Sequence, residues 1–358
     1  VQSDTTKGNQ KFRDIYYARI DTKDSAKVLV AHSSEFVPQG MMITPKASLK
    51  FASDNSFLSF GFVEIPEPEN DSIPDFEKVK LDIWVWDADY TPVTKKYSKR
   101  TFDRINYTAL YYFENGGSVV TLGDESMPYI DVDYEYLNEN ILAASDKKYR
   151  IEQQWEAITR YDLYTINIAT GERTLLDEAA RYDGMSQSPD KRYFTYYNVA
   201  DTTWYLYDIK SGKTTDLTSN IDDIFWDDQE DMPVLPTPAG MVQWFEEGDK
   251  FVISAKYDLW LFDATGKSPA VSLTEGLGNK TKTRFSINAD LLYDTRKDSR
   301  SGLSGGGTIL PDRPLILSGF NKVTKESSIY MKDIANPKAK MKKLVEGPYS
   351  YRIVGEVI

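Results

Sequence analysis

The sequence predicts an all-β fold made of repeated four-stranded antiparallel sheets. One stretch, residues 188–218, alternates aromatic, β-prone segments with tight turns. Equivalent stretches precede and follow it, which indicates a repeated structural unit. The chain also contains 24 Tyr and 7 Trp, as expected where aromatic side chains pack between sheets.

Residues 188–218 define the unit. They open with the turn SPDK, in which the proline presets φ and the aspartate can bond the nearby backbone. Strands are expected at 193–197 and 204–209, and side chains of the second alternate between two faces. A turn around Gly212 leads to a short strand at 214–217. With a further strand before the SPDK turn, the unit has four antiparallel strands.

The unit recurs along the chain. The ending at Thr218 is repeated 56 positions later at Thr274, and the turn at Gly171 is repeated 41 positions later at Gly212. Four-stranded repeats of roughly 40 to 45 residues are typical of β-propeller blades. Because one blade cannot bury both of its faces, several blades must stack around an axis.

We therefore expect residues 1–358 to form a β-propeller region with about five blades plus partial ones, in a ring that need not be complete. Within the long blade, residues 82–87 are expected to return to strand after a Pro- and Glu-rich insertion. The start in mid-blade indicates a piece of a longer protein. The expected units are a partial blade at 14–34, a long blade with its insertion at 47–123, and blades at about 129–177, 180–219, 238–275 and 283–346.

Composition excludes several classes of function. The net charge of -12 argues against non-specific nucleic-acid binding, which needs a basic surface. The chain has no Cys, so disulfides and thiol chemistry are excluded. No apolar run approaches the ~20 residues of a membrane span. We expect neither a nucleic-acid partner nor a membrane-spanning segment.

The one catalytic motif in the sequence lacks the flanking strand and helix that a hydrolase active site needs. Residues 302–306 satisfy G-x-S-x-G, the nucleophile elbow of hydrolases, but that elbow needs a strand before it and a helix after it. Neither flank fits, so Ser304 is expected in a flexible loop. The sole histidine, His32, precedes the motif and is expected to have a structural or surface role. No catalytic residue is assigned.

Metal and aromatic candidates also have simpler explanations. The acidic run 222–231 offers carboxylates to a hard cation but lacks the ordered alternation of a calcium loop, which favours a solvated loop between blades. With one His and no Cys, no zinc site is predicted, and no cofactor is expected. Four tryptophans recur at equivalent strand positions, which predicts core packing rather than a carbohydrate platform: Trp84, Trp86, Trp204 and Trp260.

One excursion carries candidate substrate-binding residues. Residues 150–156, RIEQQWE, lie between two expected strands of one blade. The carboxylates of Glu152 and Glu156, beside the indole of Trp155, can receive a peptide amino terminus by charge pairing and stacking. The alternative is a surface loop anchored by a packed Trp155.

Three motifs, taken in order, resemble one family. They are the SPDK turn with the blade endings DLT and SLT, WFEEGDK at 244–250 followed by YDLW, and LSGFNKVTKES at 317–327. Together they look like the β-propeller region of large bacterial serine peptidases of the prolyl oligopeptidase family, over residues 48–351. In that family the propeller restricts entry to short peptides, helps to bind their amino end, and precedes an α/β-hydrolase domain that carries the catalytic triad.

The resemblance implies a non-catalytic propeller that positions short peptides for a C-terminal hydrolase domain outside this chain, in an exported, periplasmic protein. The alternative is a stand-alone TolB-like propeller that mediates protein–protein interaction. A glycan-active enzyme would need paired carboxylates about 5 to 10 Å apart near the axis. Since an unclosed ring exposes sheet faces and edges, we also expect some self-association of the isolated chain.

Overall fold

The structure is a computed structural model. It describes residues 2–3, 10–19, 25–68, 74, 76–77, 81–132, 134, 138–156, 159–229, 231–287, 308–336 and 339–352. These form two compact units, residues 1–179 and 180–358, and each is described by itself. Among the described residues, no helix is long and apolar enough to cross a membrane.

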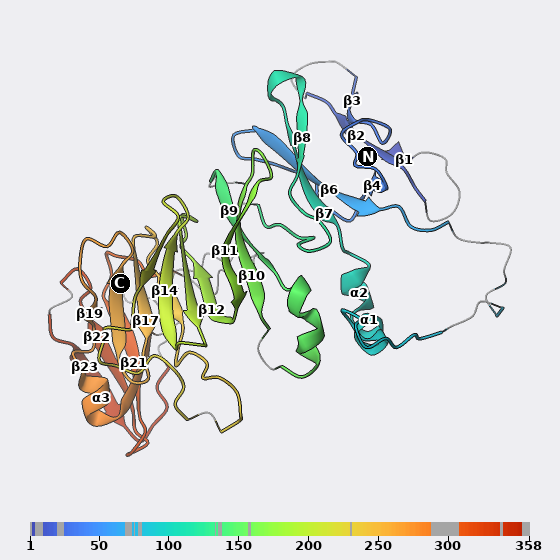
Figure 1. The fold of residues 1–358 in the computed structure, drawn as a ribbon. Coiled ribbons are helices and arrows are strands. Elements are labelled where there is room, and N and C mark those ends of the chain that lie inside the picture. The colour runs from blue at the N-terminus through green and yellow to red at the C-terminus, as the bar shows by residue number, and fades with distance from the viewer. Residues whose placement is uncertain are drawn as a thin grey trace. The chain divides into compact units, whose positions relative to one another are not determined.

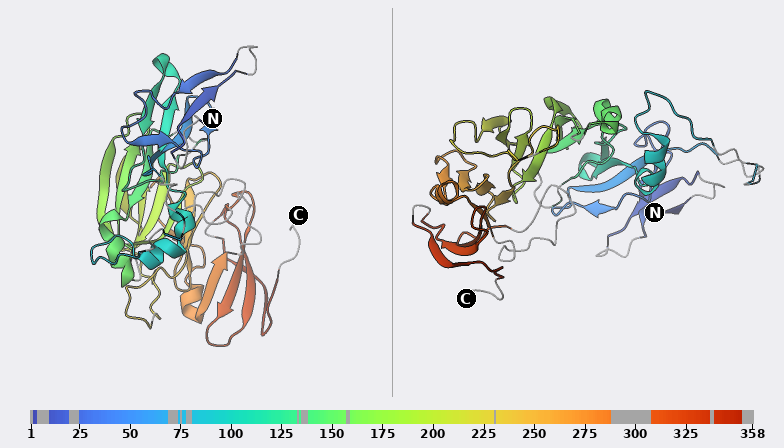
Figure 2. Two further views of the ribbon diagram at one scale, coloured as in Figure 1. Left: turned by 90° about the vertical axis from the view of Figure 1, so that its right-hand side faces the viewer. Right: turned by 90° about the horizontal axis from the view of Figure 1, so that it is seen from below.

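The described residues of the second unit form three four-stranded sheets in which every neighbouring pair of strands is antiparallel and adjacent in sequence (Figure 1). Figure 2 shows the last of them, coloured orange to red, from two further sides. A short helix, α3 (Leu277–Thr281), joins the second sheet to the third. The first sheet contains β12 (Tyr182–Gln187), β13 (Tyr193–Asn198), β14 (Thr203–Asp208) and β15 (Lys213–Asp216). The second contains β16 (Val242–Trp244), β17 (Lys250–Ser254), β18 (Leu259–Asp263) and β19 (Val271–Ser272). The third contains β20 (Thr283–Ile287), β21 (Leu315–Asn321), β22 (Ser327–Lys332) and β23 (Lys342–Gly347).

The described residues of the first unit form three further sheets, the middle one interrupted by a long connection. The first sheet has β1 (Gln2–Ser3), β2 (Arg13–Tyr17) and β3 (Lys27–Val30). The middle sheet has β4 (Met41–Ile43), β5 (Lys50–Phe51), β6 (Phe57–Glu64), β7 (Tyr107–Tyr112) and β8 (Ser118–Thr121). Helices α1 (Pro92–Tyr97) and α2 (Lys99–Phe102) lie between β6 and β7, and η1 (Glu114–Gly116) between β7 and β8. The last sheet has β9 (Asn140–Ser145), β10 (Tyr161–Asn167) and β11 (Arg173–Ala180), with η2 (Lys147–Gln154) between the first two.

Successive sheets share their cores, as stacked blades must. In the first unit, Phe57 and Leu110 of the middle sheet pack with Ile141 and Ile166 of the last sheet. In the second unit, one cluster joins the β16–β19 sheet to the β20–β23 sheet; its members include Val252, Leu259, Phe285, Leu317 and Tyr330. Burying a side chain of this size contributes about 1.5–3 kcal/mol. These blades confirm the predicted all-β propeller class.

The sequence repeat corresponds to repeated hydrogen bonds at the blade ends. Thr218 Oγ1 accepts the backbone N–H of Trp204 at 3.0 Å, and Thr274 Oγ1 accepts that of Leu259 at 3.1 Å. Each threonine therefore fixes the end of the last strand to the start of the third. The Thr274 hydroxyl also donates to the buried carboxylate of Asp258 at 2.6 Å.

One predicted strand is wrong. Residues 82–87 form no strand, and Trp84 and Trp86 are 62% and 88% exposed instead of packed in the core. The reason is that β6 pairs directly with β7, and β8 occupies the other edge of β7, so no ladder position on β7 is open. Trp204 is fully buried as predicted, and Trp260 is half-buried.

The threonine bonds predict that losing the Thr274 hydroxyl lowers the free energy of unfolding more than losing the hydroxyl of an exposed strand threonine. Thr274→Val leaves the Leu259 N–H without its side-chain acceptor and removes one donor from Asp258, so it should lower the free energy of unfolding by about 2 kcal/mol. Thr215→Val, on the exposed strand β15, is the matched control and should change it by less than about 0.5 kcal/mol. Urea denaturation followed by circular dichroism measures both; equal effects would contradict the assignment.

Candidate functional site

The excursion that carries the predicted substrate-binding residues leaves one blade between two directly paired strands. The β9–β10 ladder runs without a break from Ser145 opposite Asp162 to Asn140 opposite Asn167. The described residues of the excursion, 146–156 and 159–160, lie outside the ladder and include η2, the green helical segment beside β10 in Figure 1. The excursion therefore presents side chains at one end of the blade without disturbing its strand pairing.

The structure brings the three predicted site residues onto one turn. The backbone carbonyl of Glu152 accepts the N–H of Trp155 at 3.0 Å and that of Glu156 at 2.8 Å. The indole of Trp155 is 66% exposed, so it does not anchor the loop by packing. Glu156 is half-buried. A single carbonyl thus fixes the backbone of Trp155 and Glu156 relative to that of Glu152.

Arg160, which the sequence did not single out, holds the first carboxylate. Its Nε and Nη2 atoms lie 2.8 and 2.5 Å from Oε2 of Glu152. Both nitrogens share one oxygen, and Glu152 Oε1 makes no hydrogen bond among the described residues. The only sequence signal was an opposite charge just before β10, a pattern too common to identify a pair.

A second arginine fixes the middle of η2. The side chain of Arg150 is 10% exposed; its Nε lies 2.8 Å from Oδ1 of Asp146, and its Nη1 lies 3.3 Å from Oδ2 of Asp89. Its guanidinium also lies over the ring of Tyr90, 5.3 Å from the centroid. Asp89 and Tyr90 belong to the connection between β6 and β7, so two insertions meet at this point.

The start of η2 is attached to the blade by Asp162 of β10. This carboxylate is 2% exposed, accepts the Tyr149 hydroxyl at 2.6 Å and the Ala179 N–H at 3.1 Å, and pairs with Lys148 at 2.7 Å. Burial alone would raise the pKa of Asp162, but the bonds from Lys148, Tyr149 and Ala179 outweigh it and lower that pKa below 3.8. Burial, together with the bond to Asp162, raises the pKa of Tyr149 to about 12.

The lowered pKa of Asp162 predicts a pH-dependent contribution to stability. Because its folded pKa lies below the unfolded value of 3.8, the stabilisation is present above about pH 4 and is lost as pH falls through the folded pKa. Asp162→Asn should lower the free energy of unfolding by about 1–3 kcal/mol at pH 7 and reduce its acid dependence between pH 5 and 2. Thermal unfolding at several pH values tests this. An acid dependence identical to that of the wild type would contradict the role of Asp162.

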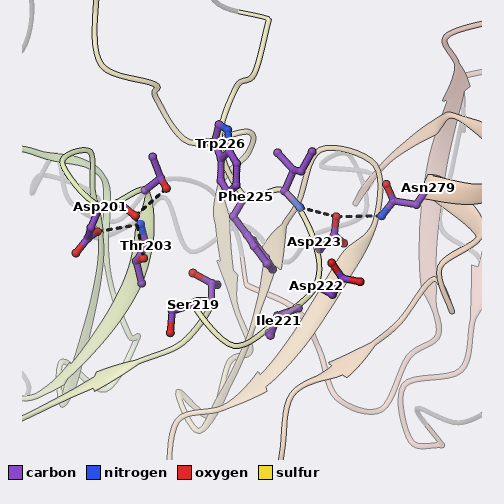
Figure 3. Close-up of a pocket in the computed structure, with 12 residues that line it drawn as sticks. Asp201, Thr203, Ser219, Ile221, Asp222, Asp223, Phe225, Trp226 and Asn279 are labelled. Atoms are coloured by element: carbon purple, nitrogen blue, oxygen red, sulfur yellow. Dashed lines mark hydrogen bonds between the residues drawn. The ribbon is translucent and has the colours of Figure 1, made fainter.

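The second unit holds a pocket of about 730 Å³, within the usual range of small-molecule sites (Figure 3). Figure 3 shows Asp201 and Thr203 on one side and Asn279 on the other, with Phe225 and Trp226 between them. Its walls come from the connection before β14 and the start of that strand, from the connection after β15, and from α3. Its lining residues are Asp201, Thr202, Thr203, Thr218, Ser219, Ile221, Asp222, Asp223, Ile224, Phe225, Trp226 and Asn279.

The acidic run 222–231 begins in this pocket, and two of its carboxylates make structural hydrogen bonds or ion pairs. Asp223 accepts the indole N–H of Trp260 at 2.7 Å, the side-chain amide of Asn279 at 3.0 Å and the N–H of Ile224 at 2.8 Å. Further along, Asp228 pairs with Lys256 at 2.5 Å. Among the described residues, no three His, Cys, Asp or Glu side chains gather in a group suited to a metal ion.

His32 forms a structural pair with Asp14. Its Nδ1 lies 2.8 Å from Oδ1 of Asp14, which also accepts the His32 backbone N–H at 2.8 Å. These bonds lower the pKa of Asp14. The ring of Phe12 packs against the imidazole, with centroids 5.8 Å apart. Ser304 lies outside the described residues.

No protein-family model and no curated protein sequence matches the chain. Among solved structures, similarity extends to Porphyromonas gingivalis dipeptidyl peptidase 4, at 13% identity and a TM-score of 0.37, over 66% of this chain and 36% of that one. A putative TolB from Agrobacterium tumefaciens matches at 10% identity and a TM-score of 0.30, over 84% of this chain and 80% of that one. A putative dipeptidyl aminopeptidase IV from Bacteroides ovatus matches at 10% identity and a TM-score of 0.30, over 92% of this chain and 39% of that one. These similarities are distant.

Proposed function

We propose that this chain is the non-catalytic propeller region of an exported, periplasmic serine peptidase resembling the prolyl oligopeptidase family. It gates and positions short peptides for an α/β-hydrolase domain outside residues 1–358. The observation that carries the proposal is the turn at the end of η2, where the Glu152 carbonyl accepts the N–H groups of Trp155 and Glu156 and the indole of Trp155 is exposed. The motif order in the sequence supports the family.

The arrangement suits the amino end of a peptide. An ammonium group donates three hydrogen bonds and pairs with carboxylates, and charge-assisted bonds are about twice as strong as neutral ones. Arg160 holds Oε2 of Glu152 and leaves Oε1 to meet such a donor. The indole of Trp155 adds a face that attracts a cation. An acetylated amino end has no charge and keeps one N–H donor of the three, so the site should discriminate against it.

Peptide binding by this chain tests the site. Tripeptides with alanine at the first position and a free amino end should bind about tenfold more tightly than their N-acetylated forms, as measured by isothermal titration calorimetry. Glu152→Gln and Trp155→Ala should abolish most of this preference. Glu247→Gln and Trp86→Ala, at exposed positions outside η2, are the matched controls and should leave it unchanged. Equal affinity of the wild type for both forms would refute the site.

Peptide cleavage tests the domain arrangement. The 358-residue chain should not cleave short chromogenic peptides, whereas the protein made from the full reading frame should cleave them, and a serine-directed fluorophosphonate should abolish that activity. Cleavage by the 358-residue chain alone would contradict the non-catalytic assignment. A full reading frame without activity would count against the peptidase.

One observation favours the second candidate, a TolB-like interaction propeller. Residues 81–86 form a run of apolar side chains that are more than half exposed and have no strand partner among the described residues: Leu81, Ile83, Trp84, Val85 and Trp86. Contiguous exposed apolar surface marks protein–protein contact sites. If the wild-type chain does not distinguish free from acetylated peptides and the full reading frame is inactive, this second function becomes the better account.

A further inference from the structure

Two insertions from different blades of the first unit meet at Arg150. One is the β9–β10 excursion that contains η2, and the other is the β6–β7 connection, residues 65–106. The second insertion places Asp89 3.3 Å from the guanidinium and Tyr90 beneath it. The ring of Tyr90 in turn packs edge-on against Phe102 of α2, with centroids 4.9 Å apart. The contact is thus continuous from α2 to η2.

The buried guanidinium of Arg150 depends on these partners for its charge and hydrogen bonds. Its side chain is 10% exposed, and a charge removed from water is costly unless it is paired and hydrogen-bonded. Asp146, on its own excursion, covers one side of the guanidinium at 2.8 Å. The β6–β7 insertion supplies the other side through Asp89 and the face of Tyr90. Burial is the largest cause of a raised pKa for the Tyr90 phenol, so this ring is neutral at pH 7.

Fixing Arg150 orients the predicted peptide site. Arg150 and Glu152 lie two residues apart on the same short helix, so rotation of η2 about its axis would move both. Arg160 holds Oε2 of Glu152, and the backbone carbonyl of Glu152 accepts the N–H groups of Trp155 and Glu156. The Arg150 contacts oppose such a rotation.

We infer that Asp89 and Tyr90 are positioning residues for the peptide amino-end site and act through Arg150. This inference rests on the proposed function, since it concerns the same site. It gives the β6–β7 insertion a role in substrate binding, although that insertion belongs to a different blade. The insertion orients η2, which carries Glu152 and ends at the turn that leads to Trp155 and Glu156.

The test is the same titration with free and N-acetylated tripeptides, applied to variants of the full 358-residue chain. Tyr90→Ala should reduce affinity for the free-amine peptide about tenfold, and Asp89→Asn roughly threefold, with little change for the acetylated peptide. Tyr90→Phe keeps the ring against Arg150 and Phe102 and should retain wild-type affinity. In an Arg150→Met background, Asp89→Asn should add little, because the guanidinium through which Asp89 acts is already absent.

Matched controls come from the same insertion. Asp82→Asn and Tyr97→Ala alter exposed side chains that make no hydrogen bond or ring contact among the described residues, and they should bind as the wild type does. Circular dichroism checks folding; if Tyr90→Ala is unfolded, Asp89→Asn and Tyr90→Phe decide the matter.

The outcomes separate this inference from the proposed function. No preference for the free amine in the wild type overturns both. A preference that Glu152→Gln abolishes but Asp89→Asn and Tyr90→Ala leave intact overturns only the positioning role. Loss of affinity in Tyr90→Phe equal to that in Tyr90→Ala also overturns it, because the retained ring should suffice.

Discussion

The blades depend on a short polar side chain that accepts backbone N–H groups where a strand turns back. Its oxygen bonds the amide two residues ahead at 2.8–3.0 Å, and a residue with positive φ then closes the turn. This geometry fixes which residues of the two strands face each other. A slip of one position would turn every buried side chain to the opposite face, so the turn decides the core. The pairs are Asn167 with Gly171, Asp208 with Gly212, Asp263 with Gly266 and Asn321 with Lys325.

These turns explain how much of the fold was predictable. They are local in sequence, as are the SPDK turn and the threonine endings, so the repeat could be recognised without knowledge of long-range contacts. Residues 82–87 show the limit of the approach. They alternate like a strand, but a strand also needs an open neighbour, and β6 and β8 already occupy both edges of β7. Pairing partners are a property of the whole sheet, which a local pattern does not contain.

In the candidate site, too, contacts between residues close in sequence were predictable and contacts between distant residues were not. Glu152, Trp155 and Glu156 lie within five residues, so their grouping could be predicted from sequence, and the structure adds the shared carbonyl that spaces them. The partners of Arg150 could not be predicted. Asp89 lies 61 positions earlier, and its contact exists only because two insertions fold toward each other. The strand repeat in the sequence contains no information about a contact between two insertions.

Long insertions are compatible with the fold because they enter between strands that stay paired. The β6–β7 ladder is continuous from Phe57 opposite Tyr112 to Phe62 opposite Tyr107, although residues 65–106 intervene. The connection between β9 and β10 behaves in the same way. In the β12–β15 blade the equivalent connection is short, and its Asp201 lines the pocket. Because the ladders persist on both sides, this connection is free to vary in length, and two such connections carry exposed indoles: Trp84 and Trp86 in one, and Trp155 in the other.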